Sequence, residues 1–424
     1  MSQSSLLQSQ SCQSLDDWLC YIEQSHPIEK IDLGLSRVQR VATQAHLDQL
    51  PGVVVLVAGT NGKGTTIRTL EQLLLAQGHS VGVYSSPHLL KFNERLRLNG
   101  HDATDAQWVQ GLAQVEALRG DVALTYFEFT TLAAFAILKQ YPPAYCLIEV
   151  GLGGRLDATN IIDPTLSVLT TVDLDHQDWL GPDRESIGRE KAGIFRQAKP
   201  VVMADLQPPS SALAIASQLA CPVKQAGVDF CWQAGASGFA LQLGELRLSD
   251  LPLPALPLQN VCAALMVLQL LGVLPETSLL RQVLPQLALP GRMQWLRQQP
   301  AVLADVAHNP QSAAYLAAQL RRLAPQYRQI HLLVGMLKDK DIAGALLPFA
   351  GQGYHWHLTS LPGPRGACAQ QLQTLLPTSE GCFLLDDVAD GYNLLLTQLQ
   401  SHDLLVVFGS FITVSAVLAV QENL

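Results

Sequence analysis

The sequence has neither an apolar run long enough to cross a membrane nor an excess of basic charge. None of its uncharged apolar runs approaches the ~20 residues that a membrane span needs. Its 27 Lys and Arg are outnumbered by 36 Asp and Glu, which gives a net charge of −9. A general nucleic-acid binder would need a basic face. The N-terminal segment also lacks the basic and apolar regions of a secretory signal. We therefore expect a cytoplasmic protein that binds neither membranes nor nucleic acid.

The sequence also lacks paired cysteines. Its eight cysteines are scattered, and no two have the CxxC spacing of a zinc knuckle or a thioredoxin-type site. A chain of 424 residues, 48% of them hydrophobic, can bury sizeable cores and does not need a disulfide frame. We expect reduced thiols. At ~150 residues per domain, the length suggests two or three domains.

Apolar runs and helical patterns alternate through most of the chain, which predicts an α/β fold. In a first domain (1–290), strands are expected at 53–58, 80–84, 145–150 and 166–172, and helices at 64–76 and 127–139. The segment 227–258 has short alternating stretches that predict a β-hairpin or small β excursion, followed by a helix at 259–271. Proline and glycine are frequent at 285–300, so we expect a linker at 291–300.

A second α/β series fills the expected C-terminal domain, residues 301–424. Strands at 301–306, 330–335, 354–359, 382–386 and 404–409 alternate with helices at 311–323, 341–350, 367–376, 388–399 and 412–421. Five strands alternating with helices predict a doubly wound parallel sheet with right-handed crossovers.

The strongest local signal is the glycine-rich segment 58–66, AGTNGKGTT, which follows an apolar strand and opens a helix. Glycines let backbone N–H groups face a phosphate, and a helix N-terminus adds a partial positive charge. Lys63 can reach terminal phosphates, and Thr65 or Thr66 can help to hold Mg²⁺. The spacing departs from GxxxxGK[ST], because Gly62 and Gly64 flank the lysine.

Polar residues follow other predicted strands. Ser86 is a candidate ligand of a hard cation, although an ordinary Ser-Pro turn explains it equally well. Glu149 is a second candidate; a solvated strand end could also explain it, but the glycine-rich segment 151–154 next to it favours a ligand site. His176 lies among three aspartates in DLDHQDW, a candidate metal or proton-transfer cluster. Lys191 lies on a predicted amphipathic helix, where the residues alone favour a surface lysine.

Two further candidates lie near the linker. Arg292 could present a planar fork to phosphate or carboxylate. Asp305 ends the first strand of the second domain, at the strand end where open α/β sheets bind ligands.

Together these segments closely resemble bacterial folylpolyglutamate synthase/dihydrofolate synthase, within the Mur-ligase-like amide ligases. The matching strings are AGTNGKGTT, VGVYSSPHL, LTYFEFTTL, EVGLGGRLDATNI, DHQDWLGPDRESIGREKAGIFR, LPGRMQ, DVAHNP, VGMLKDKDIAG and FGSF. The resemblance implies a P-loop N-terminal domain of Mur-ligase type and a smaller Rossmann-like C-terminal domain. It also implies an ATP-dependent ligase that adds L-glutamate to dihydropteroate, and further glutamates to the γ-carboxyl of reduced folates, through an acyl phosphate.

The resemblance assigns roles to particular residues. The ATP-binding residues would be Thr60, Asn61, Gly62, Lys63, Gly64, Thr65, Asn260, Arg292, Asp305 and His308. One or two Mg²⁺ would be held by Ser86, Glu149, His176 and Lys191, the last as a carbamylated lysine (N6-carboxylysine); Lys63, His176 and Lys191 would be catalytic. The pteroate site would comprise Asp32, Leu33, Gly34, Leu35, Thr125, Tyr126, Phe127, Glu128, Leu156, Asp157 and Ala158. The expected partners are small molecules, and the protein is expected to be a monomer.

The chain departs from the family pattern at Ile412, where many relatives have His after FGSF. One alternative is a sibling Mur-type ligase acting on a peptidoglycan precursor, with a different acceptor pocket. Another is a nucleotide-controlled switch without ligase chemistry, but the sequence has no NKxD-type base-reading motif.

Overall fold

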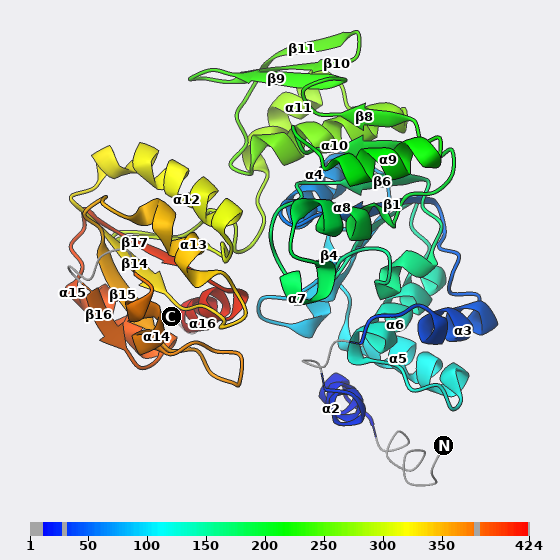
Figure 1. Cartoon of the computed structure of the whole chain (residues 1–424), viewed down its shortest axis with the longest axis horizontal. Coiled ribbons are helices and arrows are strands. Elements are labelled where there is room, and N and C mark those ends of the chain that lie inside the picture. The colour runs from blue at the N-terminus through cyan, green and yellow to red at the C-terminus, as the bar shows by residue number, and fades with distance from the viewer. Residues whose placement is uncertain (1–11, 28–31, 377–381, 423–424) are drawn as a thin grey trace. The chain divides into compact units, whose positions relative to one another are not determined.

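The computed structural model describes residues 12–27, 32–376 and 382–422. These divide into two compact units. The first comprises residues up to 174 together with 180–287, and the second comprises 175–179 together with 288–424. Both units are α/β structures built on a mainly parallel sheet, as the sequence predicts (Figure 1).

The sheet of the first unit has eight strands in the order β4-β3-β2-β5-β1-β6-β7-β8. The strands are β1 (Val53–Ala58), β2 (Val81–Tyr84), β3 (Leu96–Leu98), β4 (His101–Asp102), β5 (Tyr145–Glu149), β6 (Leu166–Leu169), β7 (Val201–Met203) and β8 (Val223–Gln225). The strands from β2 to β8 along this order are parallel, and β3 and β4 form an antiparallel edge. The carboxyl ends of β1, β2, β5 and β6 therefore lie at one edge of the sheet.

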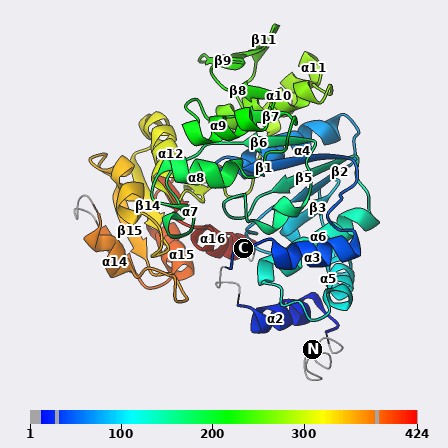
Figure 2. The ribbon, with the colours of Figure 1, turned by 45° about the vertical axis from the view of Figure 1, so that its right-hand side comes forward.

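Helices cover both faces of this sheet (Figures 1 and 2). The helices of this unit are α2 (Leu15–Ser25), α3 (Ser36–Ala45), α4 (Lys63–Ala76), α5 (Asp105–Arg119), α6 (Tyr126–Gln140), α8 (Arg184–Ala192), α9 (Ser210–Gln218), α10 (Leu258–Leu270) and α11 (Thr277–Val283). The short α7 (Gln177–Leu180) lies mostly in residues 175–179, which belong to the second unit.

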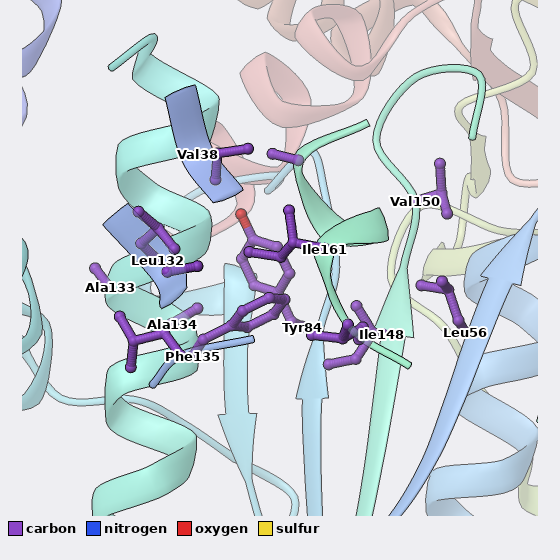
Figure 3. Close-up of a cluster of buried hydrophobic side chains, with 14 of the residues drawn as sticks. Val38, Leu56, Tyr84, Leu132, Ala133, Ala134, Phe135, Ile148, Val150 and Ile161 are labelled. Carbon is purple, nitrogen blue, oxygen red and sulfur yellow. The ribbon is translucent and has the colours of Figure 1, made fainter. Parts of the chain in front are cut away.

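The helix α6 packs on one face of the sheet through an almost continuous apolar surface. Leu132 and Phe135 lie near Tyr84 and Ile148, as Figure 3 shows. Alternate strand residues point to opposite faces, so Val55 and Val57 face the other side, where α4 packs on β1, β2 and β5. Because both faces are covered, the central strands are apolar runs without alternation.

A small antiparallel sheet follows β8. It is formed by β9 (Phe230–Ala234), β10 (Phe239–Leu243) and β11 (Leu246–Leu251), so the excursion at 227–258 has three strands rather than a single hairpin. The inward residues Phe239, Leu241 and Leu243 alternate along β10 and are buried. The helix α10 follows, as the sequence predicts.

The second unit has a six-stranded sheet in the order β12-β13-β17-β14-β15-β16. The strands are β12 (Gln294–Gln298), β13 (Ala301–Asp305), β14 (Gln329–Val334), β15 (His355–Thr359), β16 (Cys382–Leu385) and β17 (Asp403–Phe408). The helices are α12 (Pro310–Leu323), α13 (Ile342–Leu346), α14 (Ala369–Thr374), α15 (Val388–Gln398) and α16 (Phe411–Glu422). The first three contribute to the core on one face, and α15 and α16 pack together against the other.

The expected linker at 291–300 is wrong in one respect, because it contains a strand. β12 pairs antiparallel with β13, so the sheet has one strand more than the five parallel strands predicted. Its sequence, QWLRQ, is polar because the strand lies at the sheet edge and is largely exposed. All eight cysteines are free. In the described residues, no helix has both the length and the apolar character needed to span a membrane.

Candidate active site

The glycine-rich loop between β1 and α4 is hydrogen-bonded to the residues that follow β6. Thr60 donates its backbone N–H to the carbonyl of Thr171 at 2.7 Å, and its hydroxyl lies 3.0 Å from the carbonyl oxygen of Asp173. The Asn61 carbonyl accepts from the hydroxyls of Thr170 and Thr171 at 2.8 and 3.0 Å. The loop is thus held by side chains and backbone of the neighbouring strand, which leaves α4 to begin at Lys63.

Gly62 is the N-cap of α4 and has a φ of +96°, a conformation that favours glycine. A Cβ at this position would lie only 2.5 Å from Asn260 Oδ1. Asn260 is on α10 and is buried, and its Oδ1 has no hydrogen-bond partner within the described residues. The structure therefore brings together two residues that are 198 positions apart and that were both predicted to bind ATP.

Two lysine amines converge on one carbonyl oxygen of the loop. Lys63 Nζ donates to Gly59 O at 3.1 Å and to Thr60 O at 3.4 Å, and Lys191 Nζ donates to Gly59 O at 3.0 Å. Glu149 Oε1 lies 4.0 Å from Lys63 Nζ. Lys191 is only 5% exposed, so the local expectation of a surface lysine is wrong. Gly64 and Thr65 are in the first turn of the same helix.

Ser86 follows β2, two residues beyond Tyr84, and Glu149 is the last residue of β5. Parallel pairing of β2 with β5 places both at the same sheet edge as the loop. Within the described residues, no group of three or more His, Cys, Asp or Glu side chains could hold a metal ion. This does not conflict with the expected ligands of the first unit, because Ser86 and Lys191 are not among those residue types.

His88 and Arg95 lie beside Ser86. Arg95 Nε donates to His88 Nδ1 at 2.9 Å. Burial and the positive charge of Arg95 lower the pKa of His88 to about 4.

In the second unit, Arg292, Asp305 and His308 lie around the start of α16. The Arg292 guanidinium carbon is 5.3 Å from the Phe411 ring centroid, and the His308 ring is 6.2 Å from it. Asp305 accepts from the backbone N–H groups of Met293 and Ala307 at 2.9 and 2.8 Å. Burial raises the pKa of Asp305, against the opposing charge of Arg292. Ile412, the departure from the family pattern, is 37% exposed.

His176 belongs to the second unit, where it lies beside Asp175. Lys340 Nζ is 2.7 Å from Asp175 Oδ1 and 3.3 Å from His176 Nε2. Burial raises the pKa of Asp175, but a hydrogen bond from His308 and the charge of Lys340 outweigh it and hold that pKa well below its usual range. His176 itself has a φ of +52°, a backbone strain that clusters at functional sites.

The three segments expected to bind pteroate lie together in the first unit. Arg37 joins two of them: its guanidinium is 3.0 Å from Asp32 Oδ2 and 3.3 Å from both oxygens of Glu128. Thr125 caps α6, and its backbone N–H donates to Glu128 Oε2 at 2.7 Å. Leu35 and Phe127 pack against the core. Leu33 and Gly34 lie between Asp32 and Leu35 and are half-buried, and Tyr126 is buried.

The third segment follows β5. A Cβ on Gly151 would lie 2.6 Å from Phe127 Cζ and 3.2 Å from Asp157 Oδ2, so only glycine allows this approach. Asp157 accepts from Leu152 N at 2.8 Å and from the N–H and hydroxyl of Thr159 at 3.0 and 2.6 Å. Burial raises the pKa of Asp157 despite these bonds. Leu156 is half-buried, and Ala158 is buried.

Sequence reasoning missed three cations at these sites: Arg37, Arg95 and Lys340. Lys340 lies within VGMLKDKDIAG, one of the strings that carry the family resemblance, but the string does not indicate which of its side chains is involved. Arg37 lies outside all of the matching strings. Arg95 lies outside every recognised motif.

Comparisons with known proteins agree with the resemblance. Residues 291–411 match the model of the Mur ligase, glutamate ligase domain. The chain is 42% identical over 413 residues to the dihydrofolate synthase/folylpolyglutamate synthase of Escherichia coli (strain K12), covering 97% of each chain. It is 38% identical to the Haemophilus influenzae protein of the same description, covering 98% of this chain and 99% of that one.

Solved structures give the same result. The structure of Escherichia coli FolC in complex with DHPP and ADP matches with a TM-score of 0.93 and 41% identity, covering 97% of this chain and 98% of that chain. A bifunctional folylpolyglutamate synthase/dihydrofolate synthase from Yersinia pestis, complexed with AMPPNP and a Mn ion, matches with a TM-score of 0.91 and 43% identity, with the same coverage.

Proposed function

Because the chain belongs to the dihydrofolate synthase/folylpolyglutamate synthase family, we propose a role in that reaction for each group of site residues. The chain is an ATP-dependent ligase that joins L-glutamate to dihydropteroate and adds further glutamates to reduced folates. These comparisons favour this activity over ligation of a peptidoglycan precursor. The observation that carries the residue roles is the convergence of Lys63, Lys191 and Glu149 at the glycine-rich loop.

The chemistry requires an activated acid. A carboxylate resists attack by an amine, so it first takes the γ-phosphoryl group of ATP, which forms an acyl phosphate and releases ADP. The glutamate amine then attacks the acyl carbon, and the tetrahedral intermediate expels phosphate. Lys63, at the N-terminus of α4, would neutralise charge on the transferred phosphoryl group. Orientation of the reactants alone can contribute ~7–11 kcal/mol.

The oxygen donors at the sheet edge suit a hard cation. Ser86 and Glu149 would hold Mg²⁺ in the first unit. His176 is the third ligand that the family resemblance predicts. When bound, Mg²⁺ supplies electrostatic stabilisation of the phosphate oxygens. The buried Lys191 amine is close to a second ammonium, which is costly in a low-dielectric site. Carbamylation would turn it into an anion able to bind a second Mg²⁺.

The residues that we propose for ATP binding occur in each of the two units. Asn260 and the loop residues Thr60–Thr65 would bind ATP in the first unit, and Arg292, Asp305 and His308 would do so in the second. The buried segments at 32–35, 125–128 and 156–158 would bind the pteroate. We also propose that the protein is a cytoplasmic monomer and that it binds no nucleic acid.

A direct test incubates the protein with ATP, Mg²⁺, L-glutamate and either dihydropteroate or tetrahydrofolate, and weighs the products by mass spectrometry. We expect Lys63→Ala to fold normally and to lose about 10²-fold or more in turnover, because it removes a group that stabilises transition-state charge. The exposed Lys199→Ala is the matched control and should retain full activity. Unchanged turnover in Lys63→Ala would remove the loop lysine from the mechanism.

A further inference from the structure

Arg95 is a buried cation without a carboxylate partner. Its side chain lies in the first unit, and the residue is only 6% exposed. Within the described residues, no ion pair joins Arg95 to an Asp or Glu. A guanidinium stays charged in proteins, and burial of an uncompensated charge is costly. A group that is absent from the chain itself would therefore be expected to complete this site.

The contacts of Arg95 add no negative charge. Its Nε donates to the neutral nitrogen of His88, at 2.9 Å from Nδ1. Its guanidinium carbon lies 5.3 Å from the Phe92 ring and 5.9 Å from the Tyr126 ring. The described residues contribute no hydrogen bond to the two terminal nitrogens, Nη1 and Nη2. Those two donors form the fork that binds a carboxylate in bidentate fashion.

The other arginines of this region do have carboxylate partners. Arg97, two residues further on, lies 3.1 Å from Glu71 Oε1. Arg37 contacts Asp32 and Glu128. Arg95 therefore differs from these two arginines in both respects: it is buried, whereas they are partly exposed, and no carboxylate of the described residues is paired with it.

The position of Arg95 relates it to two parts of the proposed site. It ends the short 3-10 helix Phe92–Arg95, and its carbonyl accepts from Ser85 N at 2.9 Å, one residue before the proposed Mg²⁺ ligand Ser86. Its guanidinium faces the ring of Tyr126, within the proposed pteroate segment. The carboxyl group of a bound pteroate must lie between these two parts if it is to receive a phosphoryl group.

We propose that Arg95 binds the benzoate carboxylate of dihydropteroate and holds it for phosphorylation. This inference rests on the proposed function. The aromatic rings of Phe92 and Tyr126 suit the aminobenzoate ring next to that carboxylate. Arg95 would then neutralise the carboxylate of the substrate. No carboxylate among the described residues competes for its guanidinium.

The test measures binding of two ligands to the full-length protein by isothermal titration calorimetry. One ligand is dihydropteroate, and the other is its uncharged carboxamide. Wild type should bind the carboxylate at least about tenfold more tightly than the amide, as expected for a charge-assisted hydrogen bond of ~1.5–3 kcal/mol. In Arg95→Met this preference should fall to near unity, while affinity for an ATP analogue stays within about twofold.

Two further variants control for a structural role. Arg97→Met removes the arginine two positions along the chain, which is paired with Glu71, and should keep the wild-type preference for the carboxylate. Arg95→Lys retains the charge but loses the fork, so its preference should be intermediate; it also provides the measurement if Arg95→Met does not fold. A wild-type preference in either Arg95 variant would overturn the inference. If wild type binds neither ligand, the proposed function itself fails.

Discussion

Three stacked histidines in the second unit predict that the stability of this unit depends on pH. His331 on β14 lies against His355 and His357 on β15, with ring centroids 4.8 and 5.3 Å away, and His357 stacks on Phe383 at 5.2 Å. His331 Nδ1 and His357 Nε2 are 3.0 Å apart, so one donates a hydrogen bond and the other accepts it. Protonation of both rings would leave two donors facing each other.

Burial, followed by the charges of neighbouring histidines, lowers the pKa of His331 and of His357 to about 4 each. The unfolded chain binds these protons near pH 6.5, so it holds more protons than the folded chain between about pH 4 and 6.5. The free energy of unfolding is therefore highest above pH 6.5 and falls as the pH drops toward 4. At pH 5, one fully buried imidazole with this pKa difference lowers the free energy of unfolding by ~2 kcal/mol. Because His331 is partly exposed and its contribution is reduced by solvent, we expect the pair to lower the free energy of unfolding at pH 5 by about 2–3 kcal/mol in total.

Urea unfolding between pH 5 and pH 7.5, followed by tryptophan fluorescence, measures this dependence; Trp356 on β15 is a buried reporter in the same sheet. His357→Phe keeps the aromatic stack on Phe383 but cannot be protonated, so the pH slope should flatten even if the absolute stability falls. The exposed His402→Gln is the control and should retain the wild-type slope. An equal slope in wild type and His357→Phe would refute the reasoning.

Three further predictions concern the first unit. Gly62→Ala should weaken ATP binding measured by calorimetry, because alanine at this positive φ costs about 1–2 kcal/mol and its Cβ would clash with Asn260. Gly78→Ala is the control: Gly78 has a φ of +83° but lies in open space, so this variant should lose stability without losing ATP affinity. Arg37→Met should raise the KM for dihydropteroate about tenfold and leave the KM for ATP unchanged, and an equal rise in both would contradict a pteroate-specific role. Carbamylation of Lys191 should give a carbamate carbon signal after incubation with ¹³C-bicarbonate, and that signal should be absent from Lys191→Ala.

Much of the parallel framework could be predicted because its strands are buried on both faces. Val53–Ala58 and Asp403–Phe408 are nearly continuous apolar runs. The strands β3, β4 and β12 could not be predicted in the same way. The strands β3 and β4 have only three and two residues, too few for a pattern to show. The strand β12 is polar and largely exposed, and it lies among Pro and Gly residues that favour a linker.

The site shows the same division. A glycine-rich turn at a strand end is a local pattern, so the loop around Lys63 could be identified from neighbouring residues. Lys191 could not, because its burial comes from contact with Gly59, 132 positions away. Arg95 belongs to no motif, and only the folded structure shows that no carboxylate in the described part of the chain pairs with it. Long-range contacts of this kind leave no periodic trace in the sequence.

The three-stranded sheet β9–β11 helps to position the glycine-rich loop. Both β9 and β10 pack on α10, the helix that places Asn260 against Gly62. Residues Asn260–Leu268 are all buried, so this part of the helix is packed on every side. A substitution at Leu241, which is buried on β10, should therefore disturb α10 and with it the placement of Asn260 beside Gly62.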